Sequence, residues 1–509
     1  MMKFKSVVLL IITLMIVCGY SQPMQAAEKS PFVINLDDYA KGDGTDETEA
    51  IQRAVDAIQP TDSGENTLFH QGGVLFIPRP KKYYAISKTI NFKEKWNVTI
   101  KCETPVGVSR GMPEATYFRW IGPDGGTMFH FEACKQIRVE NLSMTAMDHM
   151  AMTRLTHDYG LVPTSRVTKG VTGILLGPEK ISNGFQTSMV FDQLSILYTA
   201  VGIKLGDCPE NGPDVMDLSF RKPLIIGFSE HAIIANSGNL ATTTFETACL
   251  TGDPGCKSAI YIKNGSVVFL NMTTGIYPYI DKPATTSEPE IEIEYGGIQV
   301  LNAWSEWPGP YLKTSKAVGP EWYKPEYTVI TAGSVNYPII LQGVRHYDGR
   351  WCDSLIKTGK NPVPISIMYD KQVPLHLIGC SLWGSVELGA DSMSTIIDQG
   401  TVFINKDCPG FGGEGITRYG RVIHIGTRDP KNARILEPYF VDRRNTPGTK
   451  PPATGVWKKG DGIINIDPNP KVPAKAWRGW ICIEAGEPGK WTPYGSLKAP
   501  SVDSAKKRK

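Results

Sequence analysis

Two ionisable side chains stand side by side in the sequence S-E-H-A-I, where Glu230 and His231 precede the apolar segment that begins at Ala232. A carboxylate beside an imidazole can serve as an acid/base pair, because the two groups can exchange protons with a substrate. Lys257 stands just before a similar apolar segment further along the chain. Glu230 and His231 are therefore candidate catalytic residues, and Lys257 is a candidate substrate contact. The alternative is that all three are solvated turn residues.

A second group of reactive side chains lies in V-R-H-Y-D-G-R-W-C-D, residues 344–353. His346 and Tyr347 are candidate bases, and Arg350 is a cation close to both in the sequence. In β-elimination, a uronate carboxylate must be neutralised before its α-proton can be removed, and these residue types suit the two tasks. His346, Tyr347 and Arg350 are therefore a second candidate catalytic set. A salt bridge within a turn is the alternative.

Two further sets could contact a substrate. Residues 145–169 lack strand periodicity, which predicts a long loop. The candidate contacts in this loop are Arg154, His157 and Tyr159. In N-A-W-S-E-W-P-G, Trp304 and Glu306 could form an aromatic wall with one carboxylate. Packing at the surface explains Trp304 and Glu306 nearly as well.

The N-terminal part of the chain indicates which elements position these residues. A short strand from Val33 leads through a Gly/Asp turn into an amphipathic helix over residues 45–58, with Asp46 and Glu49 as a capping box. A buried strand, a proline-marked turn and a second strand follow in G-G-V-L-F-I-P-R-P-K-K-Y-Y-A-I, residues 72–86.

An internal repeat predicts a solenoid. A small residue followed by Ile and a short apolar strand returns along the chain, and Ile174, Ile203, Ile233 and Ile260 are 29, 30 and 27 residues apart. Such a spacing is typical of one coil of a β-helix, whose apolar inner face is buried by stacking on the next coil. Later copies of the motif begin at Gly297 and Pro338, after larger gaps that predict longer loops. The alternative is a β-sandwich with accidental recurrence.

These N-terminal motifs resemble the pectate-lyase superfamily of right-handed parallel β-helices. The matching residues are Gly42-Asp43-Gly44-Thr45-Asp46, Ala50-Ile51-Gln52, Gly72 to Pro78 and Tyr84, whereas Arg79-Pro80 replaces the usual glycine. The resemblance implies an all-β, right-handed parallel β-helix whose open N-terminal end is covered by the helix at residues 45–58. It is much less informative about the reaction, because lyases, hydrolases, epimerases and tailspikes share the motif.

The resemblance also bears on the candidate site. Members of the superfamily bind extended polymers along one face of stacked strands, and the catalytic acids of the polygalacturonase-type members precede a small-Ile strand start, as Glu230 and His231 do. The sharp signatures of those hydrolases, of alginate epimerases and of the pectate-lyase calcium cluster are missing from the sequence. Calcium is therefore a possible cofactor but not a predicted one, and no metal ligands are assigned.

Composition excludes several classes. The formal net charge of +3 among 509 residues argues against nucleic acid as a partner, and after the N-terminus no segment is long and apolar enough to span a membrane. The 51 Gly and 37 Pro fit an all-β body with many turns. Cys249 and Cys256 flank a turn and could form a local disulfide, with buried free thiols as the alternative.

The chain divides into five parts. Residues 1–27 have the layout of a secretory signal peptide, which predicts a secreted or periplasmic protein. We expect residues 28–442 to form the β-helix and residues 443–454 to be a Pro/Gly/Thr linker. Residues 455–497 predict a small β-module that could bind carbohydrate through Trp457, Trp480 and Trp491, unless these form its core. Residues 498–509 predict a disordered tail.

Three functions are compatible with the sequence. The favoured one is a polysaccharide lyase acting by β-elimination on a uronate-containing glycan, and hydrolysis of polygalacturonase type is its closest alternative. A glycan-binding protein without activity, or a tailspike-like adhesin, is the third. The expected partner is a polysaccharide, and the protein is expected to be a monomer or a homo-oligomer, with a trimer possible.

Overall fold

The structure is a computed structural model. It describes residues 32–58, 72–104, 117–147, 168–177, 186–206, 215–276 apart from 239 and 254, 289–306 apart from 295, 312–314, 338–346, 365–369, 375–382, 385–388, 395–403, 411–412, 421–424, 440–441, 446–453, 457, 459–472 and 476–497. The predicted signal peptide and the predicted tail lie outside the described residues. No helix within these ranges is long and apolar enough to cross a membrane.

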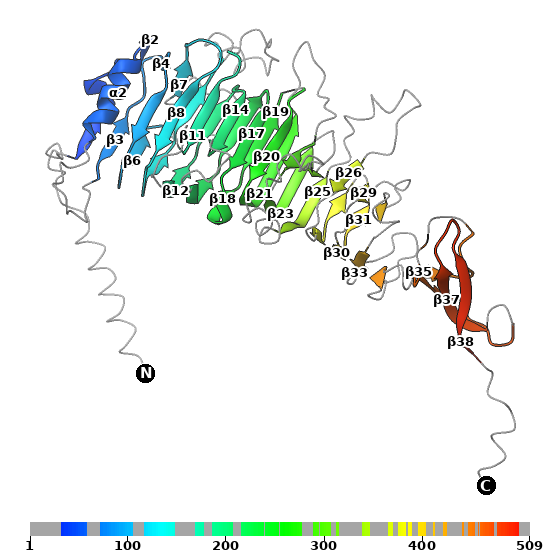
Figure 1. The fold of residues 1–509 in the computed structure, drawn as a ribbon. Coiled ribbons are helices and arrows are strands. Elements are labelled where there is room, and N and C mark those ends of the chain that lie inside the picture. The colour runs from blue at the N-terminus through cyan, green and yellow to red at the C-terminus, as the bar shows by residue number, and fades with distance from the viewer. Residues whose placement is uncertain are drawn as a thin grey trace, which may run out of the picture.

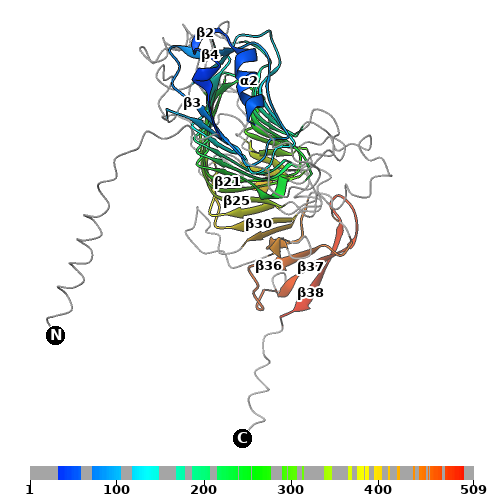
Figure 2. The same ribbon diagram turned by 90° about the vertical axis from the view of Figure 1, so that its left-hand side faces the viewer.

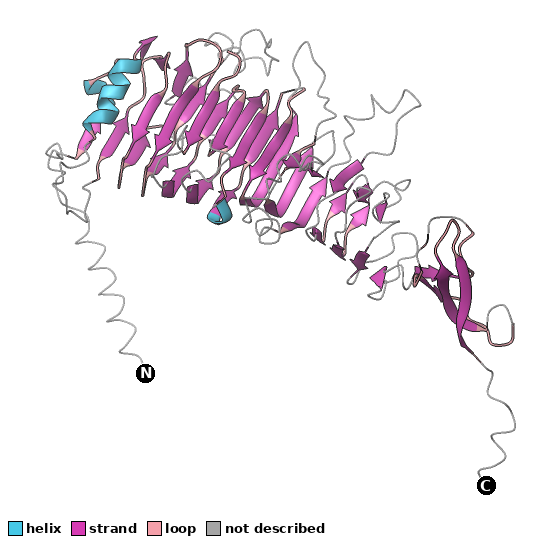
Figure 3. Ribbon diagram, viewed as in Figure 1, coloured by secondary structure: helices cyan, strands magenta, loops and turns pink. Residues whose placement is uncertain are grey.

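The chain winds as a right-handed parallel β-helix whose coils carry three strands each, and the strands form three parallel ladders along the axis (Figure 1). Figure 3 shows how strands dominate the body. The predicted fold class is therefore confirmed. Ladder 1 comprises β1 Val33–Asn35, β3 Val74–Ile77, β6 Thr99–Cys102, β9 Arg138–Glu140, β12 Gln186–Asp192, β15 Val215–Arg221, β18 Thr243–Glu246, β21 Ser266–Ile276, β23 Gly297–Glu306, β25 Ile339–His346, β27 Leu375–Ile378, β30 Thr395–Gln399 and β33 Arg421–His424.

Ladder 2 follows ladder 1 within each coil. Its strands are β2 Asp43–Asp46, β4 Tyr83–Ile86, β7 Tyr117–Trp120, β10 Ser143–Thr145, β13 Ser195–Leu197, β16 Leu224–Phe228, β19 Cys249–Gly252, the second halves of β21, β23 and β25, then β28 Ser381–Leu382 and β31 Val402–Phe403. The two ladders merge at β21, because from there one long strand runs through both.

Ladder 3 closes each coil and forms a separate sheet. Its strands are β5 Ile90–Lys93, β8 Thr127–Glu132, β11 Thr172–Leu176, β14 Val201–Leu205, β17 His231–Asn236, β20 Ser258–Asn264, β22 Ile291–Ile293, β24 Leu312–Thr314, β26 Ile365–Tyr369, β29 Ser385–Leu388 and β32 Phe411–Gly412.

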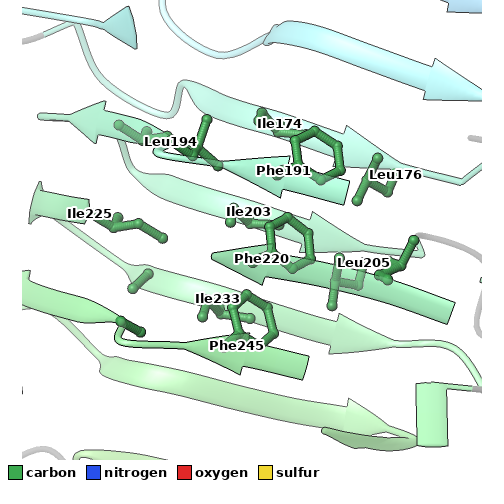
Figure 4. Packing of buried hydrophobic residues seen from close by; sticks show 14 of the residues in the cluster. Ile174, Leu176, Phe191, Leu194, Ile203, Leu205, Phe220, Ile225, Ile233 and Phe245 are labelled. Carbon is green, nitrogen blue, oxygen red and sulfur yellow. The ribbon is translucent and has the colours of Figure 1, made fainter. Parts of the chain in front are cut away.

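The isoleucines that define the repeat form one inner column of ladder 3. Ile174, Ile203, Ile233 and Ile260 are in register on consecutive strands, and all four side chains are fully buried. Figure 4 shows the first three of them above one another. The predicted repeat is therefore confirmed over these coils. The copies at Gly297 and Pro338 were assigned wrongly, because β23 and β25 belong to ladders 1 and 2, and ladder 3 continues instead through β22 and β24.

An aromatic stack fills the coil opposite this column. Phe191, Phe220, Phe245 and Phe269 pack ring on ring, with centroids 4.8, 4.5 and 4.8 Å apart. This spacing equals the distance between neighbouring strands of a sheet, so ladder pairing and ring stacking are satisfied by the same geometry.

From β9 until the ladders merge at β21, ladders 1 and 2 meet at a turn of two residues. Gln193, Lys222 and Thr247 have φ values of 55°, 51° and 55° at equivalent positions of three consecutive coils. Left-handed backbone is unfavourable for these residue types, and especially for the β-branched Thr247. The backbone N–H of each donates to a carbonyl of the next coil, and these hydrogen bonds hold the turns in place.

The N-terminal end of the coil is covered by helix α2, Thr48–Ala57 (Figure 2). Ile51, Ala54 and Val55 are buried and join the core. The predicted capping box does not form. Asp46 accepts hydrogen bonds from Thr48 and Ser87, while Glu49 pairs with Lys88. The short 3-10 helices η1 Leu36–Asp38 and η3 Leu240–Thr242 complete the described helices.

The remaining predictions on covalent structure and boundaries need two corrections. Cys249 and Cys256 are free thiols, and so are the other described cysteines, so the local disulfide was wrong. The predicted linker contains a strand, β35 Thr446–Gly448, which pairs with β36 Gly462–Asn465 of the C-terminal module. The strand β34 Phe440–Val441 pairs in antiparallel fashion with β33.

The C-terminal module is a four-stranded sheet formed by β35, β36, β37 Trp477–Glu484 and β38 Lys490–Ser496. Trp480 is buried, and Trp457 packs edge-on against Trp491 with ring centroids 5.1 Å apart. These contacts agree with the alternative in which the tryptophans form a small core. Carbohydrate binding by this module stays a prediction.

We expect Phe220→Ala to lower the free energy of unfolding by about 3–5 kcal/mol, because the ring lies in the middle of the stack and its removal leaves a cavity. Urea unfolding followed by circular dichroism measures the loss. Phe32→Ala is the matched control, since half of that ring is exposed, and it should cost less than about 1 kcal/mol. Equal losses in the two variants would contradict the stack as a source of stability.

Candidate functional site on the outer face of ladder 3

The outer face of ladder 3 carries a group of polar side chains on β20 and β22. Alternation along β22 buries Ile291 and Ile293 and leaves Glu292 and Glu294 partly exposed. Tyr261 on β20 is in register with Glu292, so the two side chains lie one coil apart on the same face.

Tyr261 and Glu294 are joined by a hydrogen bond, in which the phenol donates to Oε1 of the carboxylate. Burial raises the pKa of Tyr261, and the hydrogen bond to Glu294 and the charges of Glu294 and Glu292 raise it further. The phenol therefore stays protonated at neutral pH. It is a fixed hydrogen-bond donor rather than a base.

His231 packs behind this pair. Its ring stacks on Tyr261 with centroids 5.0 Å apart and planes 21° apart, and its Nδ1 lies 2.8 Å from Oγ of Ser258. Burial, followed by the charge of Lys257, lowers the pKa of His231 to about 4, so the imidazole is neutral at physiological pH. The side chain is only 5% exposed. The alternative in which His231 is a solvated turn residue is therefore wrong, because Tyr261 of the next coil lies against it.

Glu230 and Lys257 form an ion pair at the rim of this group. Nζ of Lys257 lies 2.8 Å from Oε2 of Glu230, and the two residues come from consecutive coils. Both side chains are exposed, at 62% for Lys257 and 41% for Glu230, so the pair contributes less than about 1 kcal/mol to stability. Its charges remain available to a ligand.

Taken together, three consecutive coils present two carboxylates, a phenol, a neutral imidazole and an ion pair on one face. Groups of this kind can transfer protons, stabilise developing charge and bind hydroxyl groups. We refer to Glu230, His231, Lys257, Tyr261, Glu292 and Glu294 as the ladder 3 cluster. Glu230, His231 and Lys257 were predicted from the sequence. The structure brings them together with Tyr261, Glu292 and Glu294.

Glu292 was missed because the repeat was followed to Gly297 rather than to Ile291. Tyr261 lies in a correctly predicted copy of the repeat, but it follows the small-Ile start, whereas the candidates were taken from the residues before it. The signal was present in the sequence. I-E-I-E, residues 291–294, alternates apolar and acidic side chains with the period of a strand that has one buried face.

His346, in contrast, lies inside the coil. It is in register with Ser305, which in turn is in register with Thr274, and all three side chains are buried. It therefore does not face the ladder 3 cluster or solvent. Tyr347 and Arg350, which were expected to act with His346, lie outside the described residues. The same holds for the predicted substrate contacts Arg154, His157 and Tyr159.

Trp304 and Glu306 occupy the outer face of ladder 2. The indole Nε1 donates to Oε1 of Glu306 at 3.1 Å, and Trp304 is exposed. They belong to a different ladder from Tyr261 and Glu292, so the structure does not place them within the ladder 3 cluster.

One carboxyl group lies inside the coil, directly behind the ladder 3 cluster. Glu290 is fully buried and accepts hydrogen bonds from the hydroxyls of Thr274 and Ser305 on two consecutive coils. Burial raises the pKa of Glu290 to about 8, although the two hydroxyl hydrogen bonds oppose this shift. The carboxyl is therefore largely neutral at physiological pH.

Within the part of the chain that the structure describes, no three His, Cys, Asp or Glu side chains are grouped so that they could hold a metal ion. Glu292 and Glu294 supply two carboxylates, which is fewer than the six to eight oxygen ligands, roughly, that Ca²⁺ takes. The described residues do not test calcium as a cofactor, and no step below depends on it.

Comparison with known proteins finds no matching family model and no matching curated protein. Among solved structures, ORF18 of Geobacillus virus E2 is 13% identical, with 92% of this chain and 78% of that chain covered and a TM-score of 0.43. The A-module of an Azotobacter vinelandii mannuronan C-5 epimerase is 12% identical, with 74% and 99% covered and a TM-score of 0.40. Likenesses this distant carry no argument about activity, and membership of the pectate-lyase superfamily stays a prediction.

We expect Glu290→Gln to change how stability depends on pH. The pKa of Glu290 is raised from 4.5 to about 8, so the folded state holds this proton more tightly than the unfolded chain. The contribution of Glu290 to the free energy of unfolding of the wild type is fully present below pH 4.5. Between pH 4.5 and about 8 this contribution falls by about 1.4 kcal/mol per pH unit. The Gln variant cannot titrate, so its free energy of unfolding relative to wild type should rise with pH over this interval.

Urea unfolding at a series of pH values measures the difference. Glu49→Gln is the control, because that side chain is 72% exposed, and its pH profile should run parallel to that of wild type. Parallel profiles for Glu290→Gln and wild type would show that the buried carboxyl does not titrate as described.

Proposed function

We propose that the protein is a secreted or periplasmic enzyme that cleaves a polysaccharide on the outer face of ladder 3. The observation that carries the proposal is the arrangement of Tyr261, Glu292 and Glu294, two carboxylates and a phenol on one face of two neighbouring coils. Structural stability does not require such a group at the surface. An elongated face built from stacked strands suits an extended polymer.

Hydrolysis is the reaction that this arrangement supports best. Glycoside hydrolysis uses two carboxyl groups, one to protonate the leaving oxygen and one to activate water or attack the sugar. Glu292 lies on β22 and Glu294 directly follows the strand. Inverting enzymes hold their two carboxyl groups roughly 6.5–9.5 Å apart, a distance that two long side chains two positions apart can span.

The contacts suggest how the two roles divide. Glu294 accepts a hydrogen bond from the phenol of Tyr261, which orients its carboxylate, so we assign Glu294 as the base. Glu292 then suits the general acid. The exposed ends of Lys257 and Glu230 could bind hydroxyl groups of neighbouring sugars.

A β-elimination remains the second candidate, and one observation favours it. The ammonium of Lys257 is exposed and could offset the charge of a uronate carboxylate, which elimination requires. The two reactions give different products. Hydrolysis releases reducing ends only, whereas elimination also produces an unsaturated uronate that absorbs ultraviolet light.

We expect Glu292→Gln and Glu294→Gln each to lower kcat by about 10²–10⁴-fold, since each removes one proton-transfer group and keeps the shape of the side chain. Turnover is measured as reducing ends and as ultraviolet absorbance, on a panel of uronate-containing and neutral glycans. Glu246→Gln is the matched control, because that partly exposed carboxylate belongs to ladder 1, and it should retain full activity.

Full activity in both Glu292 and Glu294 variants would contradict the hydrolytic assignment. An unsaturated product from the wild type, together with loss of activity in Lys257→Ala, would move the assignment to elimination. A wild-type protein that binds glycans of the panel but cleaves none would support the non-catalytic alternative.

A further inference from the structure

The outer face of ladder 2 carries a line of exposed side chains at its merged region. Thr273 on β21, Trp304 on β23 and Arg345 on β25 are in register on three consecutive coils. All three side chains are exposed, and Trp304 is 41% exposed. A large exposed indole is unusual at the surface of a soluble protein and often marks a binding surface.

The indole ring is held in one orientation. Its Nε1 donates to Oε1 of Glu306 at 3.1 Å, and Glu306 lies on the same face two positions further along β23. The residue in register with Glu306 on the preceding coil is Gly275, which has no side chain to cover this part of the face. The ring is therefore positioned before any ligand arrives, which lowers the entropic cost of binding.

These residue types together suit a sugar polymer. The apolar face of a pyranose ring packs on an aromatic ring, while Arg and Thr donate hydrogen bonds to hydroxyl or carboxylate oxygens. Neighbouring coils are about 4.8 Å apart, a distance close to the length of one sugar unit in an extended glycan. Consecutive sugars could therefore meet Thr273, Trp304 and Arg345 in turn.

We propose that Thr273, Trp304, Glu306 and Arg345 form a glycan-binding platform on ladder 2 that is separate from the ladder 3 cluster. Trp304 supplies the stacking surface, Glu306 holds the indole, and Arg345 and Thr273 bind the polar edges of the flanking sugars. The ligand is an extended polysaccharide, and both neutral and acidic chains present the chemistry that the platform recognises.

Affinity electrophoresis tests the proposal, in native gels that contain polygalacturonate, alginate or an α-1,3-glucan as the probe. Glu292→Gln serves as the parent for all variants, so that the probe is not cleaved and the outcome is independent of the proposed reaction. We expect at least one probe to retard the parent, and Trp304→Ala to weaken binding about tenfold or more. Retardation by polygalacturonate and alginate alone would assign the ligand to acidic glycans and the flanking contact to Arg345.

Two variants separate stacking from folding. Trp304→Phe keeps an aromatic ring and should retain most of the retardation, whereas it loses the hydrogen bond to Glu306. Ile481→Ala removes an exposed apolar side chain from the C-terminal module and should bind as the parent does. The proposal is overturned if no probe retards the parent, or if Trp304→Ala is retarded as strongly as the parent.

Discussion

The register between coils is the constraint on which the rest of this structure depends. In parallel strands, a shift of one residue moves every side chain to the opposite face. The inner columns fix the register, because Ile203 must lie on Ile174 and Ile233 on Ile203 for the coil to stay filled (Figure 4). The position of every outer residue follows, and Tyr261 meets Glu292 only because Ile260 and Ile262 meet Ile291 and Ile293.

Glu290 is an acidic residue at an inner position that small apolar residues occupy in earlier coils. The first inner position of ladder 3 holds Gly173, Gly202, Ala232 and Ala259 in earlier coils, and Ile196 and Ile225 of ladder 2 lie against the two glycines. At β22 a glutamic acid takes the small residue's place, and Thr274 and Ser305 take the place of the bulky aliphatic residues. The buried carboxyl gains two hydroxyl partners, which a buried polar group requires.

The sequence predicts the fold of this protein better than it predicts the turns between strands or the candidate site. The isoleucine spacing and the amphipathic helix predict the solenoid and its cover, because both follow from apolar periodicity. The turns at Gln193, Lys222 and Thr247 could not be predicted, since these residues do not favour left-handed backbone and are held there by hydrogen bonds between coils. For the candidate site, the sequence predicts that Glu230 and Lys257 stand near each other, but not that Tyr261 covers His231, which depends on contacts between coils.

The sequence E-I-E-I-E, residues 290–294, illustrates the limit of periodicity. Strict alternation would place all three glutamates on the outer face, yet Glu290 lies inside the coil with Ile291. The reason is that ladder 3 strands begin with two consecutive inward residues, as Ala232 and Ile233 do in an earlier coil. One strand thereby places a neutral carboxyl in the core and two carboxylates outside. The same residue type is thus fully buried at one position and partly exposed two and four positions later, and the coil geometry, rather than the local sequence, decides which environment each has.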